Sequence, residues 1–447
     1  MELLIQISQF LLSLSLLIIL HEFGHFLPAR LFKTRVEKFF LFFDVKFALF
    51  KKKIGETVYG IGWLPLGGYV KISGMIDESM DKEQMAQPAQ PWEFRSKPTW
   101  QRLIIMLGGV IMNFIIALLI YIFASYYYGD SDIDTHSLKD GYSVENPILK
   151  SIGFQTGDKI VSVDGKTYTN YSDLRNNLII ANTITISRNG EEKEYTLPED
   201  FLGKLSDSDD RSLFEVRYPF LVGKVPDTSA NAKAGLKEGD YITALGGTPT
   251  PYFDVLKQVL DTHKDTTLQA TILRDGNTLQ LPMVINKEGK MEIFPSQNLA
   301  SIEKLGLLKI TTKEYGFLES FGVGTSKFID KFAWYGNQLK KIFNPSTGAY
   351  KGVGGFYAIF GIFPDVWSWE AFWSITAFLS IMLGVLNLLP IPALDGGHVM
   401  FLLWEMITGK KPSDKFMEYA QMIGFFLLIA LVLFANGNDI YRALTGK

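Results

Sequence analysis

The sequence predicts a polytopic α-helical membrane protein with four transmembrane helices, a membrane-associated β-hairpin and two small, mainly β domains. Four apolar segments are long enough to cross a bilayer, which requires about 20 mostly apolar residues. Between the second and third segments the chain becomes polar and contains an internal repeat with hairpin signals. A Pro/Gly turn between two β-prone runs follows the first apolar segment.

The composition limits the classes of function. Hydrophobic residues make up 47% and charged residues 20% of the 447 residues, a mixture that combines membrane spans with soluble domains. The formal net charge of −3 gives no indication of nucleic-acid binding. Because the chain has no cysteine, disulfides and thiolate ligands are excluded, and any zinc must be held by His, Asp or Glu.

The four spans are expected at residues 1–27, 102–127, 371–396 and 417–437. The first has the length of a secretory signal, but it lacks a basic amino end and a small-residue cleavage site, so we expect it to be retained.

Charged residues near the span ends predict the orientation. Basic residues follow the first span, precede the second and separate the third from the fourth: Arg30, Lys33, Arg35, Lys38, Arg95, Lys97, Arg102, Lys410, Lys411 and Lys415. Acidic residues follow the second span and precede the third: Asp130, Asp132, Asp134, Asp365 and Glu370. The positive-inside rule therefore predicts that residues 28–101 and 397–416 face the cytoplasm, while both chain ends, including the tail 438–447, lie outside with the long segment between the second and third spans.

The first span ends in His21-Glu22-Phe23-Gly24-His25. Residues i and i+4 of a helix share a face, so His21 and His25 can both direct a ring nitrogen at one cation. Glu22 lies beside them, where a carboxylate can take a proton from a metal-bound water. Ionisable groups at membrane depth are usually functional. The alternative is a chance pattern at a helix end whose polar side chains reach the interface.

The third span supplies a matching carboxylate. Pro390 and Pro392 break the helix near its cytoplasmic end, which is tolerated where irregular backbone is buried in protein or lines a polar cavity. Asp395 follows at about the depth of the two histidines. Two His and one carboxylate leave a fourth zinc position open for water, so we expect one zinc ion per chain. The alternative is an Asp that caps a helix before a Gly turn.

The cytoplasmic segment 28–101 contains the run from Gly60 to Ser73, which predicts a hairpin with a Pro/Gly turn. Gly67 and Gly68 leave one backbone edge uncluttered, and an open edge is a template for another extended chain. The alternative is a hairpin that only plugs into the membrane face.

The outer segment contains a repeat that resembles tandem PDZ domains, at residues 128–215 and 216–300. A PDZ groove receives a peptide by strand addition. Because neither copy has the Gly-Leu-Gly-Phe carboxylate loop, a steric cap with no peptide ligand is an equal alternative. The repeat consists of Gly153–Ile160 with Gly165 and Arg188–Gly190, and of Gly235–Ile242 with Gly247 and Arg274–Gly276.

The linker 301–370 mixes apolar and basic residues over Phe328–Phe343, which predicts an interfacial amphipathic helix. The glycine-rich stretch Gly348–Gly361 is expected as a loop, either part of a substrate gate or an ordinary linker.

Three motifs together resemble the site-2 protease family of intramembrane zinc metalloproteases. They are the HExxH motif, Pro65-Leu66-Gly67-Gly68-Tyr69-Val70-Lys71, and Asn387-Leu388-Leu389-Pro390-Ile391-Pro392-Ala393-Leu394-Asp395-Gly396. The resemblance covers the whole chain. It implies zinc ligands at His21, His25 and Asp395 and a general base at Glu22.

The resemblance also implies substrate-binding residues. Asn387 matches the family asparagine that holds the substrate backbone. Gly109–Asn113 lies where the family often has Gly-Pro-x-x-Asn, with Val110 in place of proline, so Asn113 is the fourth candidate after Asn387, Tyr69 and Val70. His398 matches no family ligand.

The family's activity is cleavage of the transmembrane segments of single-span proteins in regulated intramembrane proteolysis. The resemblance therefore implies anti-sigma factors and remnant signal peptides as substrates, and a location in the bacterial inner membrane. The PDZ-like domains would be periplasmic and the zinc site would lie toward the cytoplasm. Two alternatives remain: a non-catalytic PDZ membrane scaffold and a membrane zinc carrier.

Overall fold

A computed structural model describes residues 2–65, 67–75, 87–208, 210–296 and 298–445. The chain divides into two compact units. We call them the core unit, formed by Met1–Gly129, Glu314–Leu339 and Val353–Lys447, and the inserted unit, formed by Asp130–Lys313 and Lys340–Gly352.

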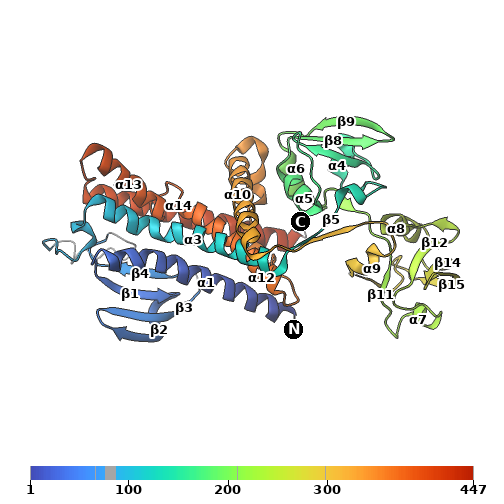
Figure 1. Ribbon diagram of the computed structural model, residues 1–447, viewed down its shortest axis with the longest axis horizontal. Helices are drawn as coiled ribbons and strands as arrows, with labels where there is room; N and C mark the ends of the chain where they lie inside the picture. The colour runs from blue at the N-terminus through green and yellow to red at the C-terminus, as the bar shows by residue number, and fades with distance from the viewer. Residues whose placement is uncertain (1, 66, 76–86, 209, 297, 446–447) are drawn as a thin grey trace. The chain divides into compact units, whose positions relative to one another are not determined.

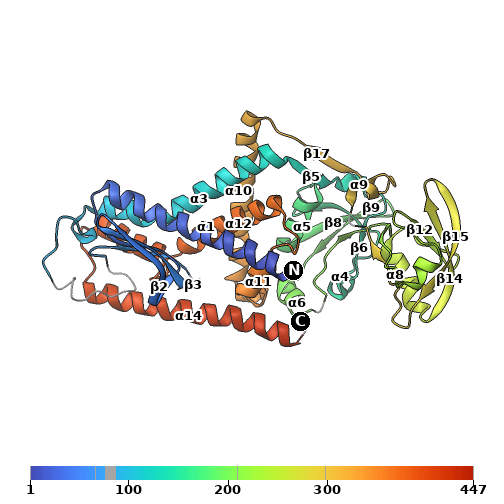
Figure 2. The same cartoon turned by 90° about the horizontal axis from the view of Figure 1, so that it is seen from below.

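The core unit contains the four helices that are long and apolar enough to cross a membrane within the described residues, as the sequence predicts. They are α1 (Glu2–Leu31), α3 (Thr99–Tyr128), α12 (Trp369–Asn387) and α14 (Asp414–Thr445). Helices α1 and α3 run side by side (Figures 1 and 2). In the apolar window of α14 only 11% of the residues are buried, against 39% in α3, so α14 is the most loosely packed span.

Glycines bring the first two spans close together. A Cβ at Gly24 would lie 2.7 Å from the carbonyl carbon of Gly108 and 2.8 Å from Cα of Gly109. Such close backbone approach is the usual role of small residues between membrane helices. It places the histidine-bearing turn of α1 directly against α3.

A four-stranded sheet lies beside the half of α1 that is remote from its N-terminal end (Figure 1). Its strands are β1 (Val36–Leu41), β2 (Phe43–Ile54), β3 (Thr57–Leu64) and β4 (Tyr69–Ile72), in the order β2-β3-β1-β4. The predicted hairpin between Gly60 and Ser73 is wrong, because β1 lies between β3 and β4, parallel to β3 and antiparallel to β4.

Burial explains this order. Val36 and Phe40 of β1 are almost completely buried, so β1 takes the interior position. Because β1 separates β3 from β4, the two strands on either side of the predicted turn do not pair with each other. Leu66, within that turn, lies outside the described residues. β2 and β3 form the actual hairpin. β4 remains at the edge of the sheet, so the open edge near Tyr69 and Val70 is retained.

The third span ends at Asn387, and α13 (Asp395–Thr408) begins after a break. Within the break Ala393 has φ 80°, an unfavourable conformation for a residue with a side chain. Residues 397–408, expected in a loop, are helical because Val399 and Leu402 are buried.

A polar cluster at the far end of α14 holds the glycine-rich segment before α11 (Phe356–Phe360). Asp439 Oδ2 accepts hydrogen bonds from the backbone N–H of Gly355 and Ala358, at 3.0 and 3.1 Å. Asn436 Oδ1 accepts from Phe356 N–H, and Asn438 Nδ2 donates to the Val353 carbonyl. These bonds satisfy four backbone groups between Val353 and Ala358.

The expected amphipathic helix is longer than its pattern suggests. Helix α10 spans Phe317–Ile342 and packs its Gly324 against Ile122 of α3. Lys327 Nζ donates to Ser125 Oγ at 2.9 Å. Of the basic residues in the predicted pattern, Lys340 and Lys341 lie in the last turn of this helix and Lys331 lies in its middle.

The first segment of the inserted unit, Asp130–Lys313, begins and ends with two antiparallel strands, β5 (Asp130–Ile133) and β17 (Ile310–Lys313). Each repeat has a small sheet and one longer helix. The first has β7 (Lys159–Val163), β8 (Thr183–Arg188), β9 (Glu191–Thr196) and α5 (Tyr171–Ile180); the second has β12 (Tyr241–Leu245), β14 (Thr266–Arg274), β15 (Asn277–Ile285) and α8 (Phe253–Thr262). Shorter elements complete the unit: β6 (Tyr142–Ser143), α4 (Pro147–Ile152), α6 (Phe201–Asp207), β10 (Glu215–Val216), β11 (Val222–Lys224), α7 (Ala230–Lys233), β13 (Thr248–Pro249), β16 (Phe294–Pro295) and α9 (Leu299–Glu303).

Each of the two repeats contains the same kind of buried ion pair. Arg188 makes a bidentate pair with the buried Asp158, at 2.6 and 2.8 Å, and donates to a backbone carbonyl. Arg274 makes the same contacts to Asp240, at 2.6 and 2.7 Å. The Gly-Asp and Arg-x-Gly parts of the sequence repeat are therefore the two halves of one ion pair. The aspartate holds the pKa of each arginine above its usual value through these hydrogen bonds.

Candidate metal centre

Helix α1 presents His21 and His25 on the same face, as the i, i+4 spacing requires. Their Nε2 atoms lie 3.3 Å apart, and the two rings are nearly perpendicular. Both side chains are buried against α3. Two ring nitrogens at this separation can share one cation.

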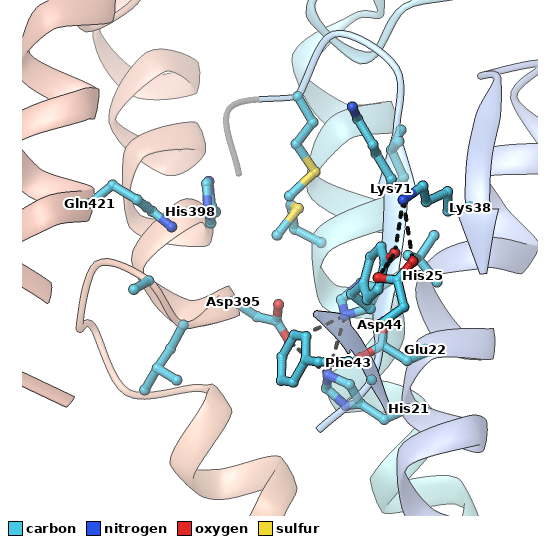
Figure 3. Close-up of a pocket in the computed structure, with 18 of the residues that line it drawn as sticks. His21, Glu22, His25, Lys38, Phe43, Asp44, Lys71, Asp395, His398 and Gln421 are labelled. Carbon is cyan, nitrogen blue, oxygen red and sulfur yellow. Dashed lines mark hydrogen bonds and ion pairs between the residues drawn. The ribbon is translucent and has the colours of Figure 1, made fainter. Parts of the chain in front are cut away.

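Asp395, the first residue of α13, brings a carboxylate to the same point (Figure 3). Its Oδ2 lies 3.3 Å from Nε2 of His21 and 3.4 Å from Nε2 of His25. In the described part of the chain, this is the single group of three or more His, Asp or Glu residues whose ligand atoms lie within 4.8 Å of one another.

The three side chains fit a zinc ion. Asp395 Oδ2 is buried and has no hydrogen-bond partner among the described residues, which a coordinated cation would supply. Two imidazoles and one carboxylate form the three-ligand set of a catalytic zinc site, which keeps one position for water or substrate. The residue types and their convergence thus agree on the same metal.

Hydrogen bonds on the far side of each ring select the ligating nitrogen. His25 Nδ1 lies 2.9 Å from the Ile105 carbonyl, to which it can only donate, so its Nε2 keeps a free lone pair.

The His21 ring has the equivalent neighbour in Asn113, whose Nδ2 lies 3.1 Å from His21 Nδ1 while its buried Oδ1 is unpaired. Amide oxygen and nitrogen exchange places when the amide turns over. Oδ1 then accepts from His21 Nδ1–H, which is the tautomer that a ligating Nε2 requires.

Glu22 lines the same cavity without joining the ligand group. The segment that leads into the edge strand β4 passes beside it, because a Cβ at Gly68 would lie 3.3 Å from Glu22 Cγ, and Val70 lines the same cavity. A carboxylate beside the metal position is placed to act on a water at the open coordination site.

A cavity of about 510 Å³ contains these groups. Tyr69 and Val70 line it from β4, and His398 and Gln421 line it from α13 and α14 on the opposite side (Figure 3). Asn387 lies outside the lining, with its Nδ2 3.5 Å from His21 Nε2. Asn113 also lies outside it, behind the His21 ring.

Sequence reasoning missed two residues of the site. Gly109 packs so tightly on the histidines that a Cβ there would lie 2.7 Å from His21 Cε1 and 2.8 Å from His25 Cε1. The position of Gly109 at the start of the Gly109–Asn113 motif could have indicated that it lies close to the site. Gln421 is a single amide in an apolar run, which gave no comparable signal.

Comparisons with known proteins agree with the site. The family model described as peptidase family M50 matches residues 9–431. The regulator of sigma-E protease of Haemophilus influenzae is 28% identical over 99% of this chain and 100% of that protein. The Escherichia coli K12 regulator of sigma-E protease is 28% identical over 98% of both chains. A protein that carries the name zinc metalloprotease in Neisseria meningitidis is 27% identical over 97% of this chain and 98% of its own length.

The match to the family model covers nearly the whole chain, including the histidine pair and Asp395. The chain therefore belongs to peptidase family M50, the site-2 proteases, and is a zinc-dependent membrane protease.

Proposed function

We propose that this protease cleaves a peptide bond within the transmembrane segment of single-span membrane proteins. The observation that carries the proposal is the convergence of His21, His25 and Asp395 in one cavity with Glu22 beside them and the edge strand β4 along its wall. The cavity belongs to the unit that contains the membrane-length helices, so substrate and site share the bilayer.

His21, His25 and Asp395 would hold the zinc ion. When bound, zinc supplies Lewis acidity to the scissile carbonyl and to the attacking water. Glu22 accepts the proton of that water and passes it to the leaving nitrogen. Asn113 fixes the His21 tautomer from behind, a positioning role in place of the substrate contact expected from the sequence. Asn387, next to the ligand atoms, binds the substrate backbone.

The substrate must unwind before it can be cut, because the peptide groups of a transmembrane helix are already hydrogen-bonded to each other. The edge strand β4 offers replacement partners along Tyr69 and Val70. Each ladder bond contributes about 0.5–1.5 kcal/mol. Pairing with β4 would also bring the scissile bond toward Glu22, which lines the same cavity as Val70.

The relatives named regulator of sigma-E protease suggest the substrate class. We infer that the substrates are anti-sigma factors trimmed on their outer side, together with remnant signal peptides. The location that goes with them is the bacterial inner membrane, with both chain ends and the inserted unit periplasmic and the zinc site toward the cytoplasm. The inserted unit, as two PDZ-like domains at residues 128–215 and 216–300, would reject substrates with intact outer domains.

A direct test compares the wild type with Glu22→Gln on tagged single-span candidates. The wild type should give a zinc-dependent fragment, while Glu22→Gln should keep zinc and lose cleavage, because an amide cannot act as a base. No fragment from any candidate would favour a non-catalytic scaffold, and zinc transport into vesicles would favour a zinc carrier. Loss of zinc together with activity in Glu22→Gln would show that Glu22 is a ligand.

A further inference from the structure

Gln421 is a polar side chain in an otherwise apolar span. It lies in α14 with only 5% of its surface exposed, and the small exposed part faces the cavity of the metal centre. No side chain or backbone group among the described residues pairs with its amide. The amide atoms are not enclosed by the protein but reach the cavity, where a bound molecule can contact them, and a polar side chain at membrane depth is usually functional.

The cavity has two facing walls. Gly68–Ile72, which includes β4, forms one, and Ala393–Asp395, His398 and Gln421 form the other. In Figure 3, Gln421 and His398 come from the helices on one side, while Lys71, His25 and Glu22 lie on the opposite side. A chain bound along β4 would therefore run between β4 and Gln421.

A strand added to β4 has two hydrogen-bonding edges, and β4 can satisfy only one of them. The other edge presents N–H and C=O groups toward the opposite wall. Lipid cannot hydrogen-bond these groups, so a polar side chain on the opposite wall would be a suitable partner. A glutamine amide has one C=O and one NH₂, which match the N–H and C=O of a peptide group.

The position of Gln421 is fixed by its own helix. Gly424 follows it by three residues and therefore lies on the same face of α14. A Cβ at Gly424 would lie 2.9 Å from Cα of Pro392 in the break before Asp395, closer than a side chain tolerates. This contact holds α14 against the segment that carries Asp395, so Gln421 is set at a defined distance from the metal centre.

We propose that Gln421 is a substrate-positioning residue, which hydrogen-bonds the outer backbone edge of an extended substrate whose inner edge is paired with β4. The inference rests on the proposed cleavage of transmembrane segments. It adds a second hydrogen-bonding partner to the substrate site. The bound chain would lie between β4, which pairs with one of its edges, and the Gln421 amide, which contacts the other.

The kinetic test compares Gln421→Leu with Met422→Leu. Met422 is the next residue, 39% exposed and outside the cavity lining, so it controls for a change in the apolar character of α14. On a single-span substrate that the wild type cuts, Gln421→Leu should lose about tenfold in kcat/KM, equivalent to about 1.4 kcal/mol. Zinc content should not change, and Met422→Leu should match the wild type. Unchanged kcat/KM in Gln421→Leu would overturn the inference while leaving the proposed function intact.

A cross-linking test reports the shape of the bound chain. The protein has no cysteine, so Gln421→Cys is a single thiol probe. The variant that combines Gln421→Cys with Glu22→Gln is mixed with a series of substrates, each with one cysteine at a different position around the scissile bond. Oxidation then forms a disulfide wherever the two thiols lie close together. Cross-links at alternate positions are expected, because the side chains of an extended strand alternate between two faces.

Two results would contradict this arrangement. Cross-links that recur every three to four residues would show a helical substrate against α14, and an absence of cross-links with a substrate that the wild type cuts would remove Gln421 from the site. Met422→Cys should give none. If the wild type cuts no single-span substrate, the proposed function fails first, and the inference fails with it.

Discussion

Gly109→Ala should damage the metal centre although Gly109 has no side chain to bind zinc. The added Cβ would lie 2.7 Å from His21 Cε1 and 2.8 Å from His25 Cε1, and it would meet His25 Nε2 more closely still. Neither ring can retreat freely, because Asn113 contacts His21 from behind and the Ile105 carbonyl contacts His25. The methyl group must therefore displace the ligand atoms or push α3 away from α1.

Adding one methyl group to a tightly packed site costs about 1–3 kcal/mol. Each ~1.4 kcal/mol of strain in the zinc-bound geometry raises the zinc dissociation constant tenfold. The strain from the added methyl group therefore raises the dissociation constant by roughly 5- to 150-fold. Thermal stability should change less, since the metal-free rings can adjust. Activity should recover when zinc is added in excess.

The assay is competition for zinc against a chelator of known affinity, together with activity as a function of free zinc. Gly336→Ala is the matched control, because Gly336 is also helical and has no neighbour within 4 Å of an added Cβ. It should leave zinc affinity unchanged. Wild-type zinc affinity in Gly109→Ala would refute the packing argument.

Three further predictions concern the ligands, the edge strand and the inserted unit. Asp395→Ala should weaken zinc binding by removing one of three ligands, and purified protein that holds stoichiometric zinc as tightly as the wild type would exclude Asp395 from the set. Val70→Pro should lower cleavage of a helical substrate roughly tenfold or more, because proline removes an edge N–H and obstructs strand pairing. Val70→Thr should be nearly silent and zinc content unchanged in both; equal activity of the two variants would remove strand addition from the mechanism. Replacing residues 134–309 by a two-residue turn that joins β5 to β17 should preserve cleavage of trimmed substrates and permit cleavage of untrimmed ones. Inactivity of this folded, zinc-loaded variant on trimmed substrates would contradict the filter.

The spacing of the histidines and the predicted helix break were enough to anticipate that His21, His25 and Asp395 lie close together. The i, i+4 spacing places the two histidines on one helix face, and the two prolines before Asp395 indicated a helix break that could bring in a carboxylate from about 370 residues further along the sequence. The hairpin prediction failed because strand order depends on non-local burial, and a turn signal near Gly67 gives no information about a third strand inserted between its flanks. The roles proposed for Asn113 and Gln421 depend on which side chain or cavity each one faces, which no periodicity encodes.

The polar end of α14 has a consequence for assembly. The glycine-rich loop before α11 is synthesised some 80 residues before Asp439, whose carboxylate accepts the N–H of Gly355. Until α14 is in place, the N–H groups of Gly355, Phe356 and Ala358 lack the side-chain oxygens that accept them in the folded protein. The loop can therefore reach its final conformation only after the fourth span inserts, so a nascent chain that already contains every zinc ligand is still incomplete at this point. This order delays completion of the core unit until synthesis of the fourth span is finished.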